Sequence, residues 1–263
     1  NSCRDYLHMK NTPGKLRAQQ LIEALQLNHL NVEAGLFSLV TQSSITVTEQ
    51  GESLPASNVI YLMLSEDEPI NYIQRLESDD YQILIEGGPA DYFLFYPDGS
   101  ADKIIMGRDV EHGQQMIVAA PGGTAKAIVL HESADYILGA SVVTPAWTPR
   151  RTVIGADDSF IDKYINKAPW ATRAKLLELI GPNFGAIVGG ADDFSLVLDH
   201  NDQMVFQGMQ LSTEQLQTEI RRFADRCPGK LLSVVVEEGA SDALVEVVKR
   251  IAEALGVIID FTE

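Results

Sequence analysis

The sequence has 263 residues, enough for two domains of ordinary size. Its 37 acidic and 20 basic residues give a formal net charge of −17, so it lacks the basic footprint that nucleic-acid phosphates or anionic lipids require. A hydrophobic content of 45% with 22% charged residues is typical of a globular protein, and the apolar runs have the length of strands rather than of membrane spans. We therefore expect neither a nucleic-acid partner nor membrane insertion.

The only two cysteines are Cys3 and Cys227, too few and too far apart for a disulfide framework. Cys227 precedes Pro228 and is expected to be a small buried residue. The stretch before Met9 has no apolar signal-peptide core and does not begin with methionine. We interpret residues 1–8 as an extension and expect a cytoplasmic location.

The pattern along the chain begins as helix and then changes to short strands. Leucine and isoleucine at helical spacing predict an amphipathic helix over 15–27. Turn signals such as Pro97-Asp98-Gly99 then separate a series of short β-rich runs. These runs cover residues 58–64, 70–76, 81–87, 91–96, 103–107, 115–121, 126–132 and 136–143. Short strands at such regular spacing predict a sandwich or a closed barrel.

After Pro149 the helical pattern returns. Two helices are predicted over 157–165 and 170–180, separated at Pro169. The glycine-rich stretch that follows is the best domain boundary in the chain. It predicts one domain over 1–182 and a second over 186–263.

The second domain has its own pattern of elements. A hairpin is followed by two helix–strand pairs, with Ser212 and Ser241 as the predicted N-caps of the helices. The expected strands cover 195–208 (the hairpin), 231–238 and 257–263. The order ββαβαβ predicts a small α+β, two-layer sandwich with both helices on one face of a sheet.

An ordered series of short motifs runs through residues 16–180. It comprises Val32-Glu33-Ala34-Gly35-Leu36-Phe37, Ile60-Tyr61-Leu62-Met63-Leu64, Gln74-Arg75-Leu76, Pro97-Asp98-Gly99, Met106-Gly107-Arg108-Asp109 and Pro121-Gly122-Gly123. In its order and spacing the series resembles the DUF985, or cupin-5, family of cupins. The resemblance implies a cupin-like jelly-roll β-barrel that takes a small polar ligand in its mouth.

Four departures from the family pattern concern metal binding. Asn31, Gln74 and Ile85 stand where the resemblance implies histidines, and Gln82 stands where it implies tryptophan. An amide oxygen is a poor ligand for a transition metal, and isoleucine is none. The remaining histidines do not lie at ligand spacing; they include His29, His112, His131 and His200. We expect no metal and no other cofactor.

Polar residues on the strands around Asp80 form the candidate ligand site. A few convergent polar groups in an apolar barrel make a binding site. The predicted set is Tyr72, Gln74, Arg75, Asp80 and Gln82, with Arg75 as the anchor of an anionic or hydroxylated ligand. Two other interpretations stay open: these residues face solvent, or Arg75 forms a salt bridge or an acid–base set with Asp79 and Asp80.

The C-terminal module resembles the soluble domain of the ExbD/TolR biopolymer-transport family. The residues that carry this resemblance are Leu196-Val197-Leu198-Asp199 and the stretches 211–227, 234–237 and 245–263. That family also has a membrane helix and a proton-sensitive acid, which the sequence does not show. The resemblance implies dimerisation or a protein partner for this module.

Together these patterns predict a two-domain binding or assembly protein that forms a homodimer and has no catalytic residues. The alternative is a metal-independent enzyme of sugar or small-molecule isomerase type that uses the barrel pocket.

Overall fold

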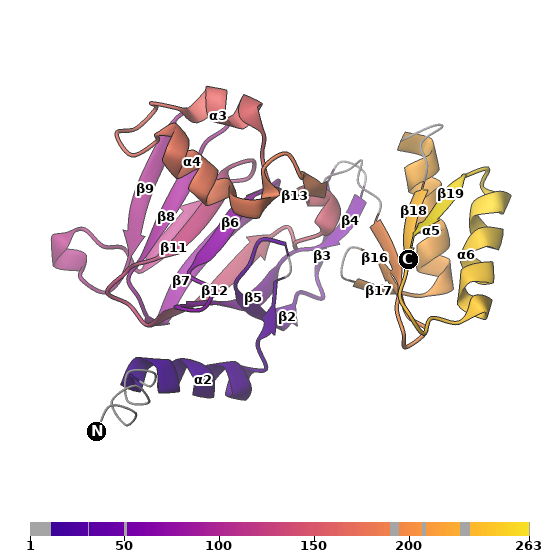
Figure 1. Cartoon of the computed structure of the whole chain (residues 1–263), viewed down its shortest axis with the longest axis horizontal. Helices are drawn as coiled ribbons and strands as arrows, with labels where there is room; N and C mark the ends of the chain where they lie inside the picture. Colours follow the sequence, from indigo (N-terminus) through magenta and orange to yellow (C-terminus); the bar gives the residue numbers. More distant parts are fainter. Residues whose placement is uncertain are drawn as a thin grey trace, which may run out of the picture. The chain divides into compact units, whose positions relative to one another are not determined.

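The computed structural model describes residues 12–30, 32–49, 52–189, 195–206, 209–226 and 232–262. The predictions for Cys3, Cys227, Asn31 and the N-terminal extension lie outside the described residues. The chain divides into two compact units, Asn1–Val188 and Gly189–Glu263, and each is described by itself (Figure 1).

The first unit is mainly β and contains two six-stranded sheets. The first sheet has the order β1 (Asn28–His29), β2 (Leu36–Gln42), β5 (Asn58–Ser65), β12 (Tyr136–Thr144), β7 (Asp79–Gly87), β10 (Ile117–Ala120). The second sheet has the order β14 (Val188–Gly189), β13 (Thr152–Ile154), β6 (Ile70–Leu76), β11 (Ala125–Leu130), β8 (Ala90–Phe95), β9 (Ala101–Met106). A separate hairpin joins β3 (Thr46–Glu49) to β4 (Glu52–Pro55).

Each of the predicted β-rich runs in the first unit forms a strand. The alternation of apolar and polar residues explains them: along β8, Tyr92 and Leu94 face one core while Phe93 and Phe95 face another. Six further strands of this unit were not predicted from the sequence: β1, β2, β3, β4, β13 and β14. Three 3-10 turns are present among the described residues of this unit, at Val110–His112, Pro149–Arg151 and Gly181–Asn183.

The core between the two sheets is formed by their inward-facing residues. It includes Leu62, Leu64, Leu84, Tyr92, Leu94, Val118, Ile128 and Ile137. The outer face of the second sheet packs against α3 (Asp158–Tyr164) and α4 (Arg173–Ile180). There Phe93 and Phe95 make edge contacts with Trp170, with ring centroids 4.9 and 5.7 Å apart. Helix α4, which was predicted to begin at Trp170, begins at Arg173 because Thr172 caps it.

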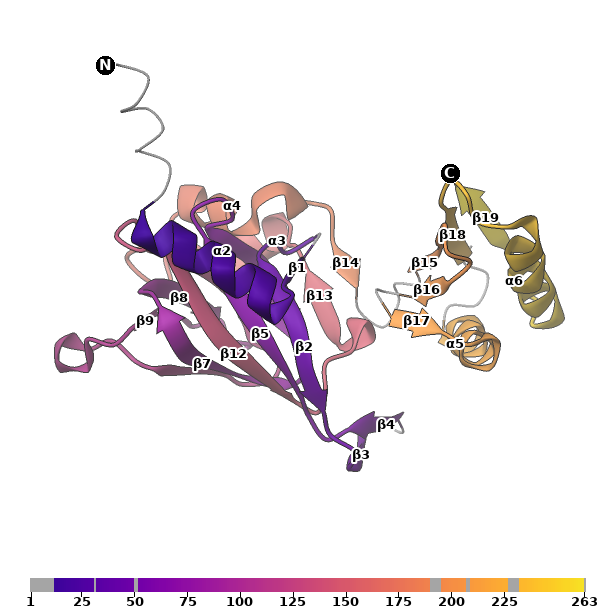
Figure 2. The same ribbon diagram turned by 90° about the horizontal axis from the view of Figure 1, so that it is seen from below.

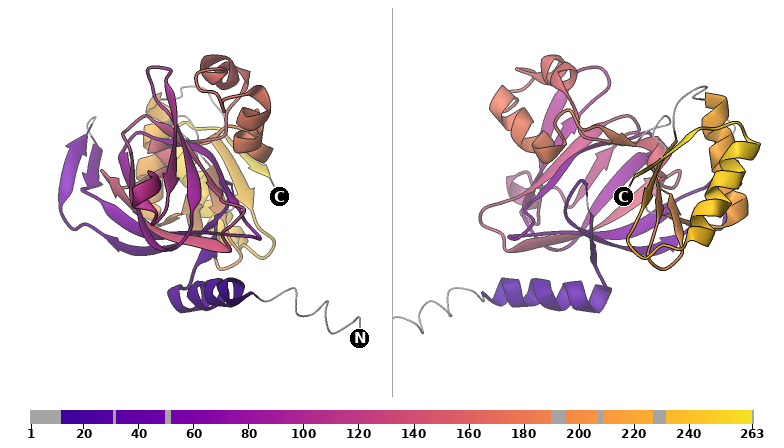
Figure 3. Two further views of the ribbon diagram at one scale, coloured as in Figure 1. Left: turned by 90° about the vertical axis from the view of Figure 1, so that its left-hand side faces the viewer. Right: turned by 45° about the vertical axis from the view of Figure 1, so that its right-hand side comes forward.

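The outer face of the first sheet packs against α2 (Pro13–Leu25), where Leu21 meets Met63 and Leu138. Figure 3 shows α2 on the opposite side of the unit from α3 and α4. One hydrogen-bonded group fixes α2: Arg17 donates to both oxygens of Glu86 at 2.8 and 3.0 Å, and the Tyr136 hydroxyl donates to Glu86 at 2.5 Å. Hydrogen bonds from Arg17 and Tyr136 lower the pKa of Glu86 to about 2.

This group makes the docking of α2 sensitive to acid. A carboxyl group with a lowered pKa in the folded state stabilises the fold above its unfolded pKa, near 4.5, and loses that contribution as the pH falls toward 2. Because Glu86 is partly exposed, we expect Glu86→Gln to reduce the free energy of unfolding by only about 1 kcal/mol at pH 7. The deficit should largely disappear at pH 2.5 in urea unfolding. An equal deficit at both pH values, or the same behaviour in the surface control Glu178→Gln, would contradict this role.

The second unit contains one five-stranded sheet of the order β17-β16-β15-β18-β19. Its elements are β15 (Ser195–Leu198), β16 (Met204–Phe206), β17 (Met209–Leu211), α5 (Thr213–Arg226), β18 (Leu232–Val236), α6 (Asp242–Ala254) and β19 (Ile259–Thr262). Both helices contribute to its core, through Leu216 and Ile220 of α5 and Val248 of α6. The predicted order ββαβαβ contains four strands, and β17 is a fifth strand that it does not include.

The predicted N-caps of this unit are present. The Ser212 hydroxyl accepts from the Gln215 N–H at 3.3 Å while Gln215 Oε1 accepts from the Ser212 N–H at 2.8 Å, which is a capping box. Ser241 caps α6 through the Leu244 N–H. Among the described residues, no helix combines the length and the apolar character needed to cross a membrane.

The glycine-rich stretch begins inside the first unit. The Gly185 N–H donates to the Ala156 carbonyl at 2.9 Å, and the Asn183 amide donates to the Val32 carbonyl at 3.0 Å. The units therefore divide at residue 188, later than the sequence pattern placed the break. Independent folding of the two domains stays a prediction.

Candidate functional site in the barrel interior

A β-bulge in β6 places two amide side chains on the inner face of the second sheet. Asn71 pairs with Ile128, and Gln74 pairs with Lys126. Between these two pairs β6 contains one residue more than β11 does, which is a β-bulge. Asn71 and Gln74 consequently point the same way although they lie three residues apart. The Gln74 amide donates to Asn71 Oδ1 at 2.9 Å, and Asn71 donates to the Ala34 carbonyl at 2.7 Å.

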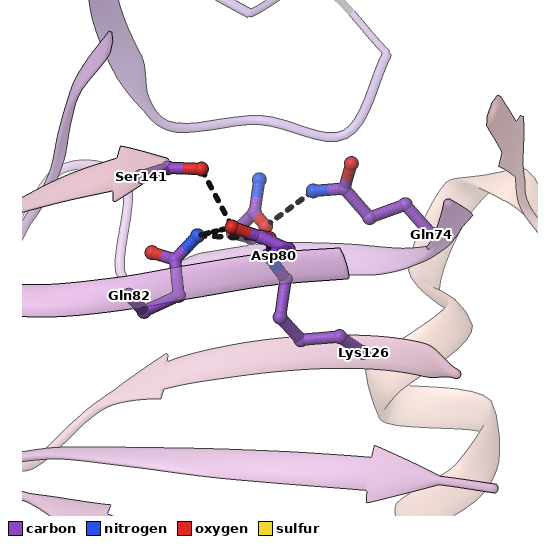
Figure 4. Close-up of polar contacts among 6 residues, drawn as sticks. Gln74, Asp80, Gln82, Lys126 and Ser141 are labelled. Atoms are coloured by element: carbon purple, nitrogen blue, oxygen red, sulfur yellow. Dashed lines mark hydrogen bonds and ion pairs between the residues drawn. The ribbon is translucent and has the colours of Figure 1, made fainter. Parts of the chain in front are cut away.

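Asp80 is the centre of the polar cluster (Figure 4). It projects inward from β7 and is 3% exposed. Its carboxylate accepts two hydrogen bonds from the Gln82 amide, at 2.8 and 2.9 Å, and one from the Ser141 hydroxyl at 2.7 Å. Ser141 lies on β12 directly opposite Gln82, so the first sheet supplies all three of these residues.

The second sheet supplies the cation. Lys126, on β11, reaches across the core and forms a buried ion pair with Asp80, and both side chains are only 4% exposed. A buried ion pair is tolerable only where hydrogen bonds satisfy the remaining polar atoms, and Gln82 and Ser141 provide these bonds for Asp80. The pair therefore links the two sheets through the middle of the unit.

One polar atom of the cluster has no such bond. Gln82 is 1% exposed, and its Oε1 has no hydrogen-bond partner. A buried acceptor without a donor costs free energy. A bound molecule that donated a hydrogen bond to this oxygen would therefore remove that cost.

Glu33 is the second acid near Lys126. Burial raises the pKa of the Glu33 carboxyl, and the charge of Lys126 opposes that shift. The neighbouring backbone carbonyls, Glu33 O and Ala34 O, accept from the Asn71 amide, which attaches this segment to β6. The arrangement thus combines a fixed ion pair, an unused acceptor and a carboxyl group that retains its proton more readily than usual.

Of the predicted site residues, Gln74, Asp80 and Gln82 converge between the two sheets, whereas Tyr72 and Arg75 do not. Tyr72 faces outward, where its ring covers Gly181 so closely that a Cβ there would lie 2.2 Å from Tyr72 Cε1. Arg75 is exposed on the outer face of the second sheet.

The predicted ion pair of Arg75 with Asp79 or Asp80 is wrong. Asp80 pairs with Lys126 instead, and Asp79 accepts from the Gly122 N–H at 2.8 Å. Sequence reasoning overlooked Lys126, Ser141, Asn71 and the position of Glu33.

Ile85 does not face the interior, contrary to what its place in the family pattern implies. It follows the alternation of β7, in which Gln82 and Leu84 point inward, and it is 39% exposed on the outside. A second bulge, in β7 between Leu84 and Glu86, turns Glu86 outward as well. The identity of Ile85 therefore has no bearing on the barrel interior. The oxygens of Asp80 are occupied by hydrogen bonds and an ion pair, and the part of the chain that the structure describes has no cluster of three His, Cys, Asp or Glu residues that could hold a metal. These side chains do not fit a transition metal, and the protein's metal content stays a prediction.

The histidines lie in separate surface contacts. His29 pairs with Glu68, His112 with Asp109 at 2.7 Å, and His200 with Glu237 at 3.1 Å. The His131 ring contacts Ser133. Each of them is exposed.

Comparisons with known proteins support the assignment of the first unit. Residues 19–153 match the family model described as Cupin superfamily (DUF985). An uncharacterized protein of Saccharomyces cerevisiae is 31% identical over 94 residues, which is 35% of this chain and 46% of that protein. The chain therefore matches about half the length of this curated relative.

Two solved structures have a similar fold. A hypothetical protein from Leishmania major is 24% identical with a TM-score of 0.52, covering 56% of this chain and 92% of that one. A protein from Shewanella oneidensis is 19% identical with a TM-score of 0.54, covering 63% of this chain and 98% of that one. The family match ends at residue 153 and does not extend to the C-terminal unit. Because the match spans just over half of the 263 residues, the chain belongs to the cupin superfamily, in its DUF985 family.

Proposed function

We propose that this protein binds a small, neutral, hydroxylated molecule inside its cupin barrel without a metal ion. The observation that carries the proposal is Gln82 Oε1, a buried acceptor without a donor beside a saturated ion pair. A ligand hydroxyl that donates to this oxygen would remove the cost of leaving it unpaired. Asp80 and Lys126 neutralise each other, so their pair favours an uncharged ligand.

The polar groups around Gln82 fit a molecule with several hydroxyls. Glu33 offers a further carboxyl group near the Lys126 ammonium, and Asn71 and Gln74 form a polar edge on β6. Inward-facing apolar residues such as Leu84, Tyr92 and Ile128 complete the surroundings. A few polar groups on an apolar wall are the usual composition of a small-molecule site.

Calorimetric titration of a panel of neutral monosaccharides and polyols tests this proposal. We expect at least one saturable ligand, whose affinity falls about tenfold or more in Gln82→Leu, because losing one well-placed hydrogen bond costs about 1–3 kcal/mol. The control Gln42→Leu changes an exposed glutamine at the end of β2 and should bind as the unmodified protein does. The proposal fails if the panel gives no ligand, or if Gln82→Leu binds its ligand with unchanged affinity.

A metal-independent isomerase is the second candidate, and Glu33 is the observation that favours it. A carboxyl group with a raised pKa next to an ammonium is suited to accept and return a proton. Incubating a bound sugar in D₂O and following deuterium incorporation by NMR tests this role. Deuterium exchange that Glu33→Gln abolishes would support an isomerase. Binding of the sugar without exchange would instead support a function in binding alone.

Assembly as a homodimer is also part of the proposal, supported by the outer face of the first sheet beyond α2. Cross-strand pairs put Val59, Val142 and Tyr81 side by side, with Ile83 next to Ile117 in the adjacent row. Tyr81 is 39% and Ile117 56% exposed. Two copies that each carry a charge of −17 repel one another, so this apolar patch, with Asp79 at its margin beside Tyr81, is where a second copy can approach.

Two further elements of the proposal rest on sequence alone. The C-terminal unit, through its resemblance to the ExbD/TolR soluble domain, would dimerise or bind a protein partner. A cytoplasmic location fits the cysteine content and the acidic composition.

A further inference from the structure

A second candidate site lies on the outer face of the second sheet, on the other side of that sheet from the barrel interior. A cavity of about 310 Å³ is present there between the strands and α3. Its lining includes Arg75, Val153, Asp157, Phe160, Lys163 and Tyr164. This volume is at the lower end of the range of small-molecule sites. Figure 1 shows α3 above the strands that form the floor of the cavity.

Arg75 brings an unneutralised positive charge to this cavity. Within the described ranges, no carboxylate forms an ion pair with its guanidinium. Glu77, its nearest acid in sequence, pairs with Arg151. Asp79 and Asp80 are bonded elsewhere. The nearby Arg151, by contrast, pairs with Glu49 and Glu77.

Lys163 supplies a second cation from α3. Its Nζ donates to the Pro97 carbonyl at 2.9 Å and lies 5.1 Å from the centre of the Tyr164 ring. Asp98 lies near enough for Lys163 to lower its pKa slightly, although hydrogen bonds from Ser100 are the main cause of that shift. Neither contact is a salt bridge, so the ammonium can still accept an anionic ligand.

The acid in the cavity wall already has a structural role. Asp157 Oδ1 caps α3, accepting from the Ser159 N–H at 3.0 Å and from the Ser159 hydroxyl at 2.5 Å. Phe160, Tyr164 and Val153 form the apolar part of the wall. The cavity therefore combines two cations, one engaged carboxylate and an apolar surface.

We propose that this cavity binds a small phosphate monoester. The planar guanidinium of Arg75 can hold two phosphate oxygens at once, and Lys163 adds a point charge, so the pair matches a dianion better than it matches a single carboxylate. The carbon skeleton of the ligand would lie against Phe160 and Tyr164. This site differs from the barrel site: Arg75 lies on the outer face of the sheet, whereas Gln74, which also borders the cavity, directs its amide to Asn71.

Titration of the full-length protein with glycerol 3-phosphate, followed by calorimetry and by amide NMR, tests the proposal. We expect saturable binding that shifts the signals of residues 153–164. The affinity should fall about tenfold or more in Arg75→Ala and several-fold in Lys163→Ala. It should fall less in Arg75→Lys, which keeps the positive charge but loses the pair of parallel N–H donors of the guanidinium. Because Arg75 and Lys163 are exposed, these variants should fold normally.

Two controls set the limits of the interpretation. Arg173→Ala removes an exposed arginine that pairs with Asp158 at 2.9 Å and should leave binding unchanged, as should Gln82→Leu in the barrel. The proposal is overturned if glycerol 3-phosphate does not bind saturably, if Arg75→Ala binds it with unchanged affinity, or if succinate binds as tightly.

Discussion

Replacing Lys126 with methionine should reduce the free energy of unfolding by about 3–5 kcal/mol at neutral pH, because removing one partner of a buried ion pair leaves the other charge without compensation. Both side chains of the Asp80–Lys126 pair are 4% exposed, so water cannot replace the lost ammonium. Urea unfolding monitored by circular dichroism measures the loss. The control Lys175→Met removes a lysine from a surface pair with Glu178 and should change stability by less than about 1 kcal/mol.

A double substitution separates the charge effect from a simple packing defect. Lys126→Met combined with Asp80→Asn removes both charges, while the asparagine can still accept hydrogen bonds from Gln82 and Ser141. We expect the double variant to regain most of the stability that Lys126→Met loses, because interaction energies between contacting residues are not additive. A single variant within 1 kcal/mol of the unmodified protein would contradict the buried pair.

Light scattering at micromolar concentration should give twice the chain mass of 28.8 kDa, and Ile117→Asp should return the protein to the mass of a single chain. Ile117 is 56% exposed on the outer face of the first sheet, beside Ile83. Figure 2 views the unit from the side that carries α2 and this sheet. In a two-fold interface a buried aspartate would be introduced twice, without a partner in either copy.

Val110→Asp is the matched control for this prediction. Val110 is 58% exposed in the 3-10 turn Val110–His112, away from the proposed interface. The Val110→Asp variant should have the same mass as the unmodified protein. A single-chain mass for the unmodified protein, or a persistent dimer in Ile117→Asp, would contradict the proposed contact.

The strands of the first unit could be predicted from the sequence because apolar alternation and turn residues are local signals. The direction of individual side chains could not, since it depends on bulges. Strict alternation puts Tyr72 on the same face as Gln74; the bulge in β6 instead pairs Gln74 inward with Asn71 and turns Tyr72 outward. The bulge in β7 acts in the same way on Glu86, which strict alternation puts inside but which accepts hydrogen bonds from Arg17 on the outer face. Neither bulge has a glycine or proline inside it that would indicate its position.

Lys126 illustrates a second limit of sequence reasoning. A lysine between two alanines in a strand is usually taken as a residue that faces solvent, because charged residues are rarely buried without a partner. Its burial follows from the position of β11 between β6 and β8 in the middle of the second sheet. Its partner, Asp80, is distant in sequence and belongs to the other sheet. Only the packing of the two sheets brings them together.

On our proposal the barrel interior is a metal-free site built on the Asp80–Lys126 pair and on the unpaired acceptor of Gln82. NMR of the glutamine side-chain amides, with equimolar Mn²⁺ added, tests this proposal, because a paramagnetic ion broadens the signals of nuclei near it. We predict that the Gln82 and Gln74 amide signals keep their width with Mn²⁺ and shift when a neutral sugar from the panel is added. Selective broadening of these two signals by Mn²⁺ would show a metal in the barrel and contradict the account.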